Sequence, residues 1–117
     1  MKPKTILCDI DGVLFEQNNA KLIDDPIILP NVKEECRRWE EIGHTIIIMT
    51  GRRESIRKRT EQQLRNAGIC YDILLMGVGI GERILINDVN SKGITKAIAI
   101  NLMRNEGLNT VKKQLGE

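Results

Sequence analysis

The feature that most constrains the fold is a series of short, continuous apolar runs separated by stretches with helical periodicity. The runs cover residues 5–8, 46–49, 73–76, 83–86 and 97–102. A strand that is apolar at every position is typical of a parallel sheet whose two faces are both covered. Because helices alternate with these strands, the sequence predicts an α/β fold with a mainly parallel five-stranded sheet and helices on both faces.

Two helices are predicted, over residues 31–42 and 54–67. Asn31 is a suitable N-cap residue with Glu34 three positions later, and Gly43 is placed to end the first helix. Residues 15–29 read as an irregular flap, and the tail 104–117 as ending in a short helix near 108–115. The link between 86 and 97 is short for a parallel crossover. The fifth strand therefore either follows an abbreviated crossover or runs antiparallel at the sheet edge.

Composition limits the class of protein. The chain has 117 residues, a formal net charge of +2 and 3% aromatic residues, which fits one globular domain over 1–117. So mild a charge does not by itself indicate a nucleic-acid or membrane partner. Three cysteines and one histidine argue against a disulfide framework or a zinc site, so we expect buried thiols in the cytoplasm. The first apolar run contains neither a signal peptide nor a membrane span, because Asp9 and Asp11 follow it at once.

Polar residues end three of the predicted strands. Asp9 and Asp11 follow the first, Thr50 and Gly51 the second, and Asp88 the fourth. In an open α/β sheet, ligands bind at the carboxyl ends of the strands. Two carboxylates two residues apart repel unless a cation intervenes, and Mg²⁺ prefers such oxygen ligands. Asp9 then suits a nucleophile and Asp11 a general acid and base.

The second strand end suits a phosphoryl group. Thr50 offers a hydroxyl, and Gly51 offers a backbone N–H with no side chain to shield it. Taken alone these two residues would equally fit a plain turn. The three strand ends together predict a phosphate and metal site.

These segments resemble the motifs of a known family. Residues 6–14 (ILCDIDGVL) resemble the first motif of the haloacid dehalogenase-like phosphatases, 46–52 (IIIMTGR) the second and 84–88 (ILIND) the fourth. The resemblance spans roughly residues 4–102. It implies a Rossmann-like hydrolase domain that removes phosphate from phosphomonoesters with Mg²⁺. The stretch around 50–54 and 71–76 is also similar to the 3′-phosphatase domain of polynucleotide kinases.

The resemblance also implies roles for single residues. One aspartate would attack phosphorus to give an aspartyl-phosphate, and the other would protonate the leaving oxygen and then activate water. These catalytic residues would be Asp9 and Asp11. The phosphate would be held by Thr50, Gly51, Arg52 and Arg83, and the metal by Asp9, Asp11 (through its carbonyl) and Asp88.

The pattern departs from the family at two places. The third motif is a Lys or Arg before the fourth strand, and no Lys lies between Lys58 and Lys92. Arg83 and Lys92 are the two candidates, and a solvated charge is an equal interpretation of Arg83. Many relatives carry a second acid in the fourth motif, where this chain has Asn87 or Lys92. A single acid, Asp88, predicts a weaker metal site, or a site completed by a neighbouring subunit.

Substrate choice remains open between three readings. Family members select substrates with cap domains, and this chain has no room for one. An open site favours a small phosphorylated metabolite such as a sugar phosphate, with a homo-oligomer closing the pocket. The basic second helix and the polynucleotide kinase likeness favour a nucleotide or nucleic-acid end instead. A degenerate domain that binds a phospholigand without turnover is the third reading.

Overall fold

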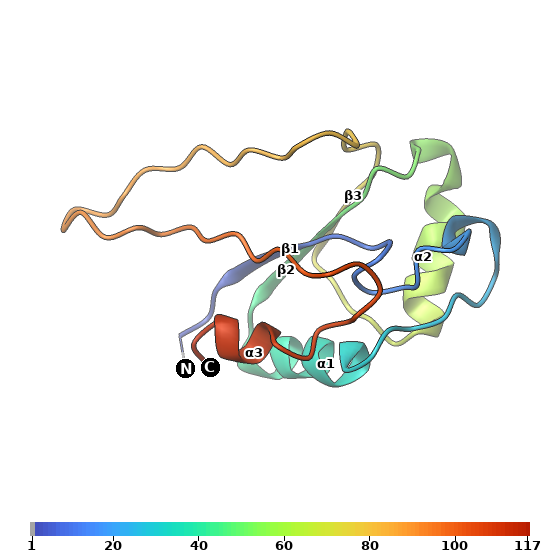
Figure 1. Cartoon of the computed structure of the whole chain (residues 1–117), viewed down its shortest axis with the longest axis horizontal. Coiled ribbons are helices and arrows are strands. Elements are labelled where there is room, and N and C mark those ends of the chain that lie inside the picture. Colours follow the sequence, from blue (N-terminus) through green and yellow to red (C-terminus); the bar gives the residue numbers. More distant parts are fainter. Residues whose placement is uncertain (1) are drawn as a thin grey trace.

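The computed structural model describes residues 2–117 and contains one parallel sheet. Its strands are β1 (Thr5–Cys8), β2 (Thr45–Met49) and β3 (Ile73–Leu75), in the order β1-β2-β3. Leu7 pairs with Ile47, which in turn pairs with Ile73. Figure 1 shows the three strands side by side. The α/β class and the first three predicted strands are confirmed.

Helices make the parallel crossovers between these strands. Helix α1 (Val32–Ile42) joins β1 to β2, and the 3-10 turn η2 (Glu54–Ile56) continues into α2 (Arg57–Asn66) before β3. Gly43 ends α1 with a φ of 91°, as predicted. Asn31 precedes α1 but its side chain does not cap it. Its Nδ2 instead donates to the Leu108 carbonyl at 3.4 Å, which ties the helix start to the tail.

The core lies on one face of the sheet. The strand residues that point toward the helices are buried with Trp39 of α1 and Leu64 of α2 in a single cluster. On the other face, Leu7, Ile73 and Leu75 are 46%, 47% and 43% exposed. Strand side chains alternate between the two faces, so α1 and α2 cover only one of them. The expectation of helices on both faces is therefore corrected.

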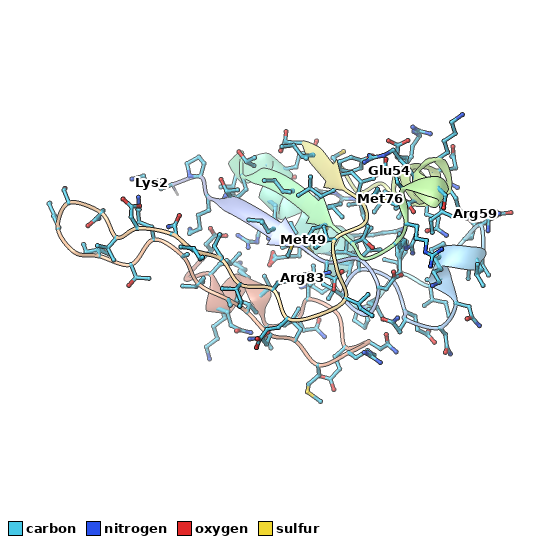
Figure 2. All side chains as sticks on the ribbon, turned by 90° about the horizontal axis from the view of Figure 1, so that it is seen from above. Lys2, Met49, Glu54, Arg59, Met76 and Arg83 are labelled. Carbon is cyan, nitrogen blue, oxygen red and sulfur yellow. The ribbon has the colours of Figure 1, made fainter. Side chains whose placement is uncertain are left out.

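The fourth and fifth predicted strands are absent from the described residues. Residues 79–103, here called the arm, form a long extended loop that projects away from the sheet in both views (Figures 1 and 2). Val89 and Thr95 form an isolated antiparallel bridge near its tip. The runs 83–86 and 97–102 have strand-like composition, but a strand also needs a neighbour for its backbone hydrogen bonds. Among the described residues neither run is hydrogen-bonded to a strand of the sheet, so neither becomes a strand.

The flap and tail follow the sequence prediction more closely. The flap 15–29 holds only the 3-10 turn η1 (Ala20–Leu22), and the tail ends in α3 (Val111–Gln114). The two ends of the chain meet, since Lys4 Nζ lies 2.7 Å from a Glu117 carboxylate oxygen. Within residues 2–117, no helix has the length and apolar character required to span a bilayer.

Candidate active site

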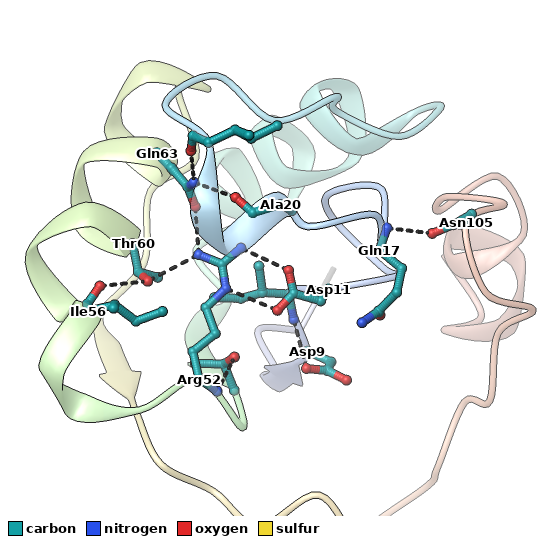
Figure 3. Close-up of polar contacts among 12 residues, drawn as sticks. Asp9, Asp11, Gln17, Ala20, Arg52, Ile56, Thr60, Gln63 and Asn105 are labelled. Atoms are coloured by element: carbon teal, nitrogen blue, oxygen red, sulfur yellow. Dashed lines mark hydrogen bonds and ion pairs between the residues drawn. The ribbon is translucent and has the colours of Figure 1, made fainter.

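The turn after β1 presents Asp9 and Asp11 together. Between them Ile10 is fully buried, and its carbonyl accepts the Leu14 N–H at 2.8 Å. The turn closes through Gly12, whose φ of 84° is a conformation that glycine adopts without strain. Because the intervening side chain points inward, both carboxylates point outward at the same end of the sheet (Figure 3). The structure therefore brings the two predicted catalytic residues together.

Asp9 is accessible and held by two donors. Its Oδ1 accepts the Ile10 N–H at 2.9 Å, and its Oδ2 lies 3.2 Å from Arg83 Nη1. The Asp9 side chain is 36% exposed. The preceding residue, Cys8, does not compete as a nucleophile, because burial raises the pKa of its thiol far above neutral pH.

Asp11 is hydrogen-bonded to a buried arginine, Arg52. Arg52 donates from Nε to Asp11 Oδ2 at 3.0 Å and from Nη2 to Asp11 Oδ1 at 2.8 Å. Two parallel bonds of this kind fix the orientation of a carboxylate as well as its charge. Arg52 is only 4% exposed.

A second layer of polar residues fixes that arginine in turn. Arg52 Nη1 donates to Thr60 Oγ1 at 3.1 Å and to Gln63 Oε1 at 2.5 Å, both on α2. Gln63 Nε2 donates to the carbonyls of Ala20 and Ile23 in the flap (Figure 3). Every nitrogen of the Arg52 guanidinium thus has a protein acceptor.

The sequence predicted Arg52 as a phosphate-binding residue, and the structure places its side chain on Asp11. Four of its five N–H donors bond to protein acceptors. Sequence reasoning also missed Gln63, which is 1% exposed. A signal for it existed, since a buried glutamine beside Leu64 on the apolar stripe of α2 requires a polar partner.

Thr50 and Gly51 lie at the end of β2, beside the same turn. Thr50 is buried, and its Oγ1 accepts the Arg52 N–H at 3.1 Å. A Cβ on Gly51 would lie 3.1 Å from both the Val78 carbonyl oxygen and Ile80 Cγ2. The base of the arm thus packs directly on Gly51, and only glycine fits there without a shift.

Two predicted residues do not reach the site. Asp88 lies out on the arm, where its side chain is 80% exposed and its Oδ1 lies 2.8 Å from Lys96 Nζ. Lys92 lies in the turn at the arm tip, where its N–H donates to Asn90 Oδ1 at 2.9 Å. Of the two candidates for the third-motif cation, the structure places Arg83 at Asp9.

The donor set at the turn fits a hard cation in part. Within residues 2–117, no three His, Cys, Asp or Glu side chains gather closely enough to hold a metal. The Asp9 carboxylate and the backbone carbonyl of Asp11 are nevertheless oxygen donors on one short turn. Mg²⁺ keeps several waters and is commonly held by one or two protein oxygens together with substrate phosphate. These residues therefore suit Mg²⁺ bound jointly with a phosphoryl group.

Comparisons with solved structures found proteins similar to this chain. The chain is 31% identical, with a TM-score of 0.58, to a chain in a structure of the Pnkp1/Rnl/Hen1 complex. That match covers 70% of this chain but only 30% of the other. A structure of the Pnkp1/Rnl/Hen1 RNA repair complex gives 32% identity, a TM-score of 0.55 and coverage of 63% and 25%. No family model and no curated protein sequence matches the chain.

A crystal structure of a Vibrio cholerae protein shares the fold over most of both chains. Its TM-score is 0.56 at 22% identity, with 73% of this chain and 80% of that chain covered. These likenesses show the α/β fold, and they agree with the resemblance to the haloacid dehalogenase-like phosphatases that the sequence motifs carry. The two matches above 30% identity are both to chains of Pnkp1 complexes, and this chain spans less than a third of the length of each.

Proposed function

We propose that the chain is a Mg²⁺-dependent phosphomonoesterase that works through an aspartyl-phosphate on Asp9. The observation that carries this proposal is that the two carboxylates, Asp9 and Asp11, have different surroundings. The Asp9 side chain is 36% exposed, so a phosphoryl group can approach it, as a nucleophile requires. Asp11 is oriented by two bonds from Arg52, as a proton carrier must be.

The proposed reaction has two steps. First, an Asp9 carboxylate oxygen attacks phosphorus, the bond from phosphorus to the leaving oxygen breaks, and Asp11 gives that oxygen a proton. Then water attacks phosphorus, Asp11 takes the proton from the water, and the bond from phosphorus to Asp9 breaks to release inorganic phosphate. Each oxygen of Asp11 keeps a further lone pair beside its bond to Arg52, so it can carry this proton without losing its orientation.

Positive charge around the phosphoryl group supplies most of the rate enhancement in such reactions. Arg83 reaches the same oxygen of Asp9 that a phosphoryl group would approach, at 3.2 Å. The Gly51 N–H and the Thr50 hydroxyl are proposed as further donors. Bound Mg²⁺, held by Asp9 and the Asp11 carbonyl, would neutralise charge on the phosphoryl oxygens.

Asp88 joins this site only if the arm folds back. Among residues 2–117 no strand pairs with the outer edge of β1, and Ile84, Leu85 and Ile86 are 77%, 65% and 92% exposed. We propose that the active form pairs the run 83–86 with this edge, which would extend the sheet toward five strands and carry Asp88 to the aspartate turn. The enzyme remains capless in this form, since only the flap and α2 occupy the places where caps are inserted. Asp88→Asn is then expected to raise the Mg²⁺ concentration needed for half-maximal activity, and an unchanged titration would remove Asp88 from the site.

The test of the reaction is phosphate release with Mg²⁺ or EDTA. Wild type is expected to hydrolyse p-nitrophenyl phosphate only with Mg²⁺, and Asp9→Asn to lose this activity because a neutral amide does not attack phosphorus. If the folded protein binds Mg²⁺ but releases no phosphate from any substrate tested, the domain is a non-catalytic phospholigand binder and the proposal is wrong.

For the substrate, the geometry favours a small phosphorylated metabolite such as a sugar phosphate. The basic residues of α2 are mostly engaged within the chain: Arg57 with Glu54 and Glu61, Arg65 with Gln62, and Arg59 with the Leu22 carbonyl. Few remain to track a phosphate backbone.

A nucleic-acid end is the second candidate, and the likeness to the Pnkp1 complexes favours it. A panel of sugar phosphates, nucleotides and 3′-phosphorylated oligonucleotides separates the two. A nucleic-acid substrate predicts a KM that rises steeply with salt, whereas a small substrate predicts a weak dependence.

We also propose a homo-oligomer in the cytoplasm. A second copy packed on the helix-free face of the sheet would cover Leu7, Ile73 and Leu75, which are otherwise about half exposed. The three cysteines are unpaired, although Cys70 is exposed rather than buried, and free thiols suit a reducing compartment. Sedimentation of wild type against Leu75→Asp tests the assembly: a monomer in both would contradict it.

A further inference from the structure

The tail crosses the catalytic turn immediately beside the two aspartates. Asn105 donates its N–H to the Gly12 carbonyl at 2.9 Å, and its Oδ1 accepts the Gln17 N–H at 2.8 Å. In Figure 3 the contact between Gln17 and Asn105 lies on the opposite side of Asp9 and Asp11 from Arg52. A second segment, distant in sequence, thus borders the site.

This crossing is anchored firmly. Gly107 packs so tightly on Pro30 that a Cβ would lie 2.2 Å from the Pro30 carbonyl oxygen. The next residue, Leu108, is 1% exposed and donates its N–H to the same oxygen at 3.0 Å. The backbone at 105–108 is therefore fixed relative to the turn.

The crossing lays one arginine over Gly12. A Cβ on Gly12 would meet Arg104 Cγ at 3.2 Å and Arg104 Cδ at 3.9 Å, so the aliphatic stem of Arg104 occupies the space that the missing side chain leaves. Arginine commonly lays its stem on a surface while its charged end stays in water. The Arg104 side chain is exposed.

The carboxylates of the site are paired with other arginines than Arg104. Arg52 is paired with Asp11, and Arg83 with Asp9. Among the contacts of residues 2–117, Arg104 has neither an ion pair nor a side-chain hydrogen bond. A guanidinium whose stem lies against the catalytic turn and whose donors are unused is suited to bind a carboxylate or phosphate oxygen through paired N–H donors.

We propose that Arg104 is a substrate-binding residue that recognises a second anionic group, carried on the leaving group of the phosphomonoester. This inference rests on the proposed phosphatase function and deepens it. The transferred phosphoryl group belongs at Asp9, with Arg83 and the end of β2. Arg104 directly precedes Asn105, which lies across the turn from Arg52 in Figure 3, and its exposed side chain can meet a part of the substrate that extends from the turn toward solvent.

The test uses two probes that differ at a single group. Glycerol 3-phosphate and 3-phosphoglycerate have the same phosphate and chain, but the second carries a carboxylate in place of a hydroxymethyl group. Dissociation constants are measured by calorimetry with Mg²⁺ in the Asp9→Asn background, where turnover does not interfere. A charge-assisted hydrogen bond predicts about tenfold tighter binding of 3-phosphoglycerate.

Arg104→Gln is expected to abolish this preference and leave the affinity for glycerol 3-phosphate unchanged. Arg104→Lys is expected to keep part of it, because the charge remains but the paired donors do not. Arg37→Gln is the matched control, an exposed arginine on α1 whose loss is expected to change neither constant.

Three results would overturn the inference. The first is that the Asp9→Asn protein binds the two probes equally or binds neither. The second is that Arg104→Gln still binds 3-phosphoglycerate more tightly than glycerol 3-phosphate. The third is that Arg104→Gln loses affinity for both probes equally, which would place Arg104 on the transferred phosphate. Hydrolysis of p-nitrophenyl phosphate keeps this separate from the proposed function. If wild type hydrolyses it and Asp9→Asn does not, but no preference exists, only the inference about Arg104 fails.

Discussion

Replacing Arg52 with methionine tests the buried network behind Asp11. The change keeps the length and much of the volume of the side chain but removes four hydrogen bonds, two to Asp11 and one each to Thr60 and Gln63. It also leaves a carboxylate and a buried glutamine oxygen without their donor. We therefore expect a large loss of stability from a single substitution.

The size of the effect follows from burial. Removing one partner of a buried ion pair costs about 3–5 kcal/mol. Asp11 is 19% exposed, so water can partly replace the lost donor and the expected cost lies toward the lower end of that range. A loss of about 3–4 kcal/mol corresponds to a fall in Tm of about 12–16 °C for a domain of this length.

The assay is thermal and urea unfolding of wild type, Arg52→Met and Arg53→Met. Arg53 is the matched control because it is the next residue, is exposed and undergoes the same change, so its cost is expected to stay within about 0.5 kcal/mol. Arg52→Met should also lose most hydrolysis at temperatures where it is still folded, because Asp11 is no longer oriented. If Arg52→Met unfolds within about 1 kcal/mol of the control, the network does not hold the site together.

Three further outcomes are expected. Arg83→Ala should lower kcat/KM for p-nitrophenyl phosphate about 30- to 100-fold, because a charged contact at Asp9 is lost. Arg57→Ala on α2 is the control and should change kcat/KM little. Equal effects of the two substitutions would mean that Arg83 is a solvated surface charge with no role in the site. Gly51→Ala should destabilise the protein by about 1–3 kcal/mol through contact with the base of the arm, whereas Gly79→Ala, with open space around it, should be nearly neutral; equal Tm values for the two would contradict the packing described. Burial opposes ionisation of Glu117, but hydrogen bonds from cationic neighbours outweigh it and lower its pKa from 4.5 to about 2. The ionised carboxylate therefore stabilises the folded protein fully above pH 4.5, and this stabilisation is lost as the pH falls toward 2. The Tm advantage of wild type over Glu117→Gln should accordingly shrink between about pH 5 and pH 3, and an advantage independent of pH would refute the linkage.

The sequence predicts the part of the fold that local patterns determine. The apolar runs before Asp9 and Thr50 become β1 and β2. The amphipathic stretch between them becomes α1, and the one after β2 becomes α2, because each such segment buries its apolar residues against its immediate neighbours. The run 83–86 has the same composition but lies on the arm in the structure. Its strand would need a partner about eighty residues away in sequence, and composition alone does not place that partner.

The site divides in the same way. Asp9 and Asp11 could be predicted as a pair, because two residues on one short turn lie close together whatever the rest of the fold is. The role of Arg52 could not, because it depends on α2 packing so that Thr60 and Gln63 face the turn. The position of Arg104 beside Gly12 could not be predicted either, because it depends on how the tail crosses the turn.

The most direct test of the account is to trap the phosphoryl group on the enzyme. The protein is mixed with p-nitrophenyl phosphate and Mg²⁺, quenched in acid within the first turnover, digested and examined by mass spectrometry. The account predicts that the peptide containing Asp9 carries a phosphoryl group in wild type, and that the Asp9→Asn protein carries none. Phosphate release without any label on Asp9, or a label on another residue, would contradict it.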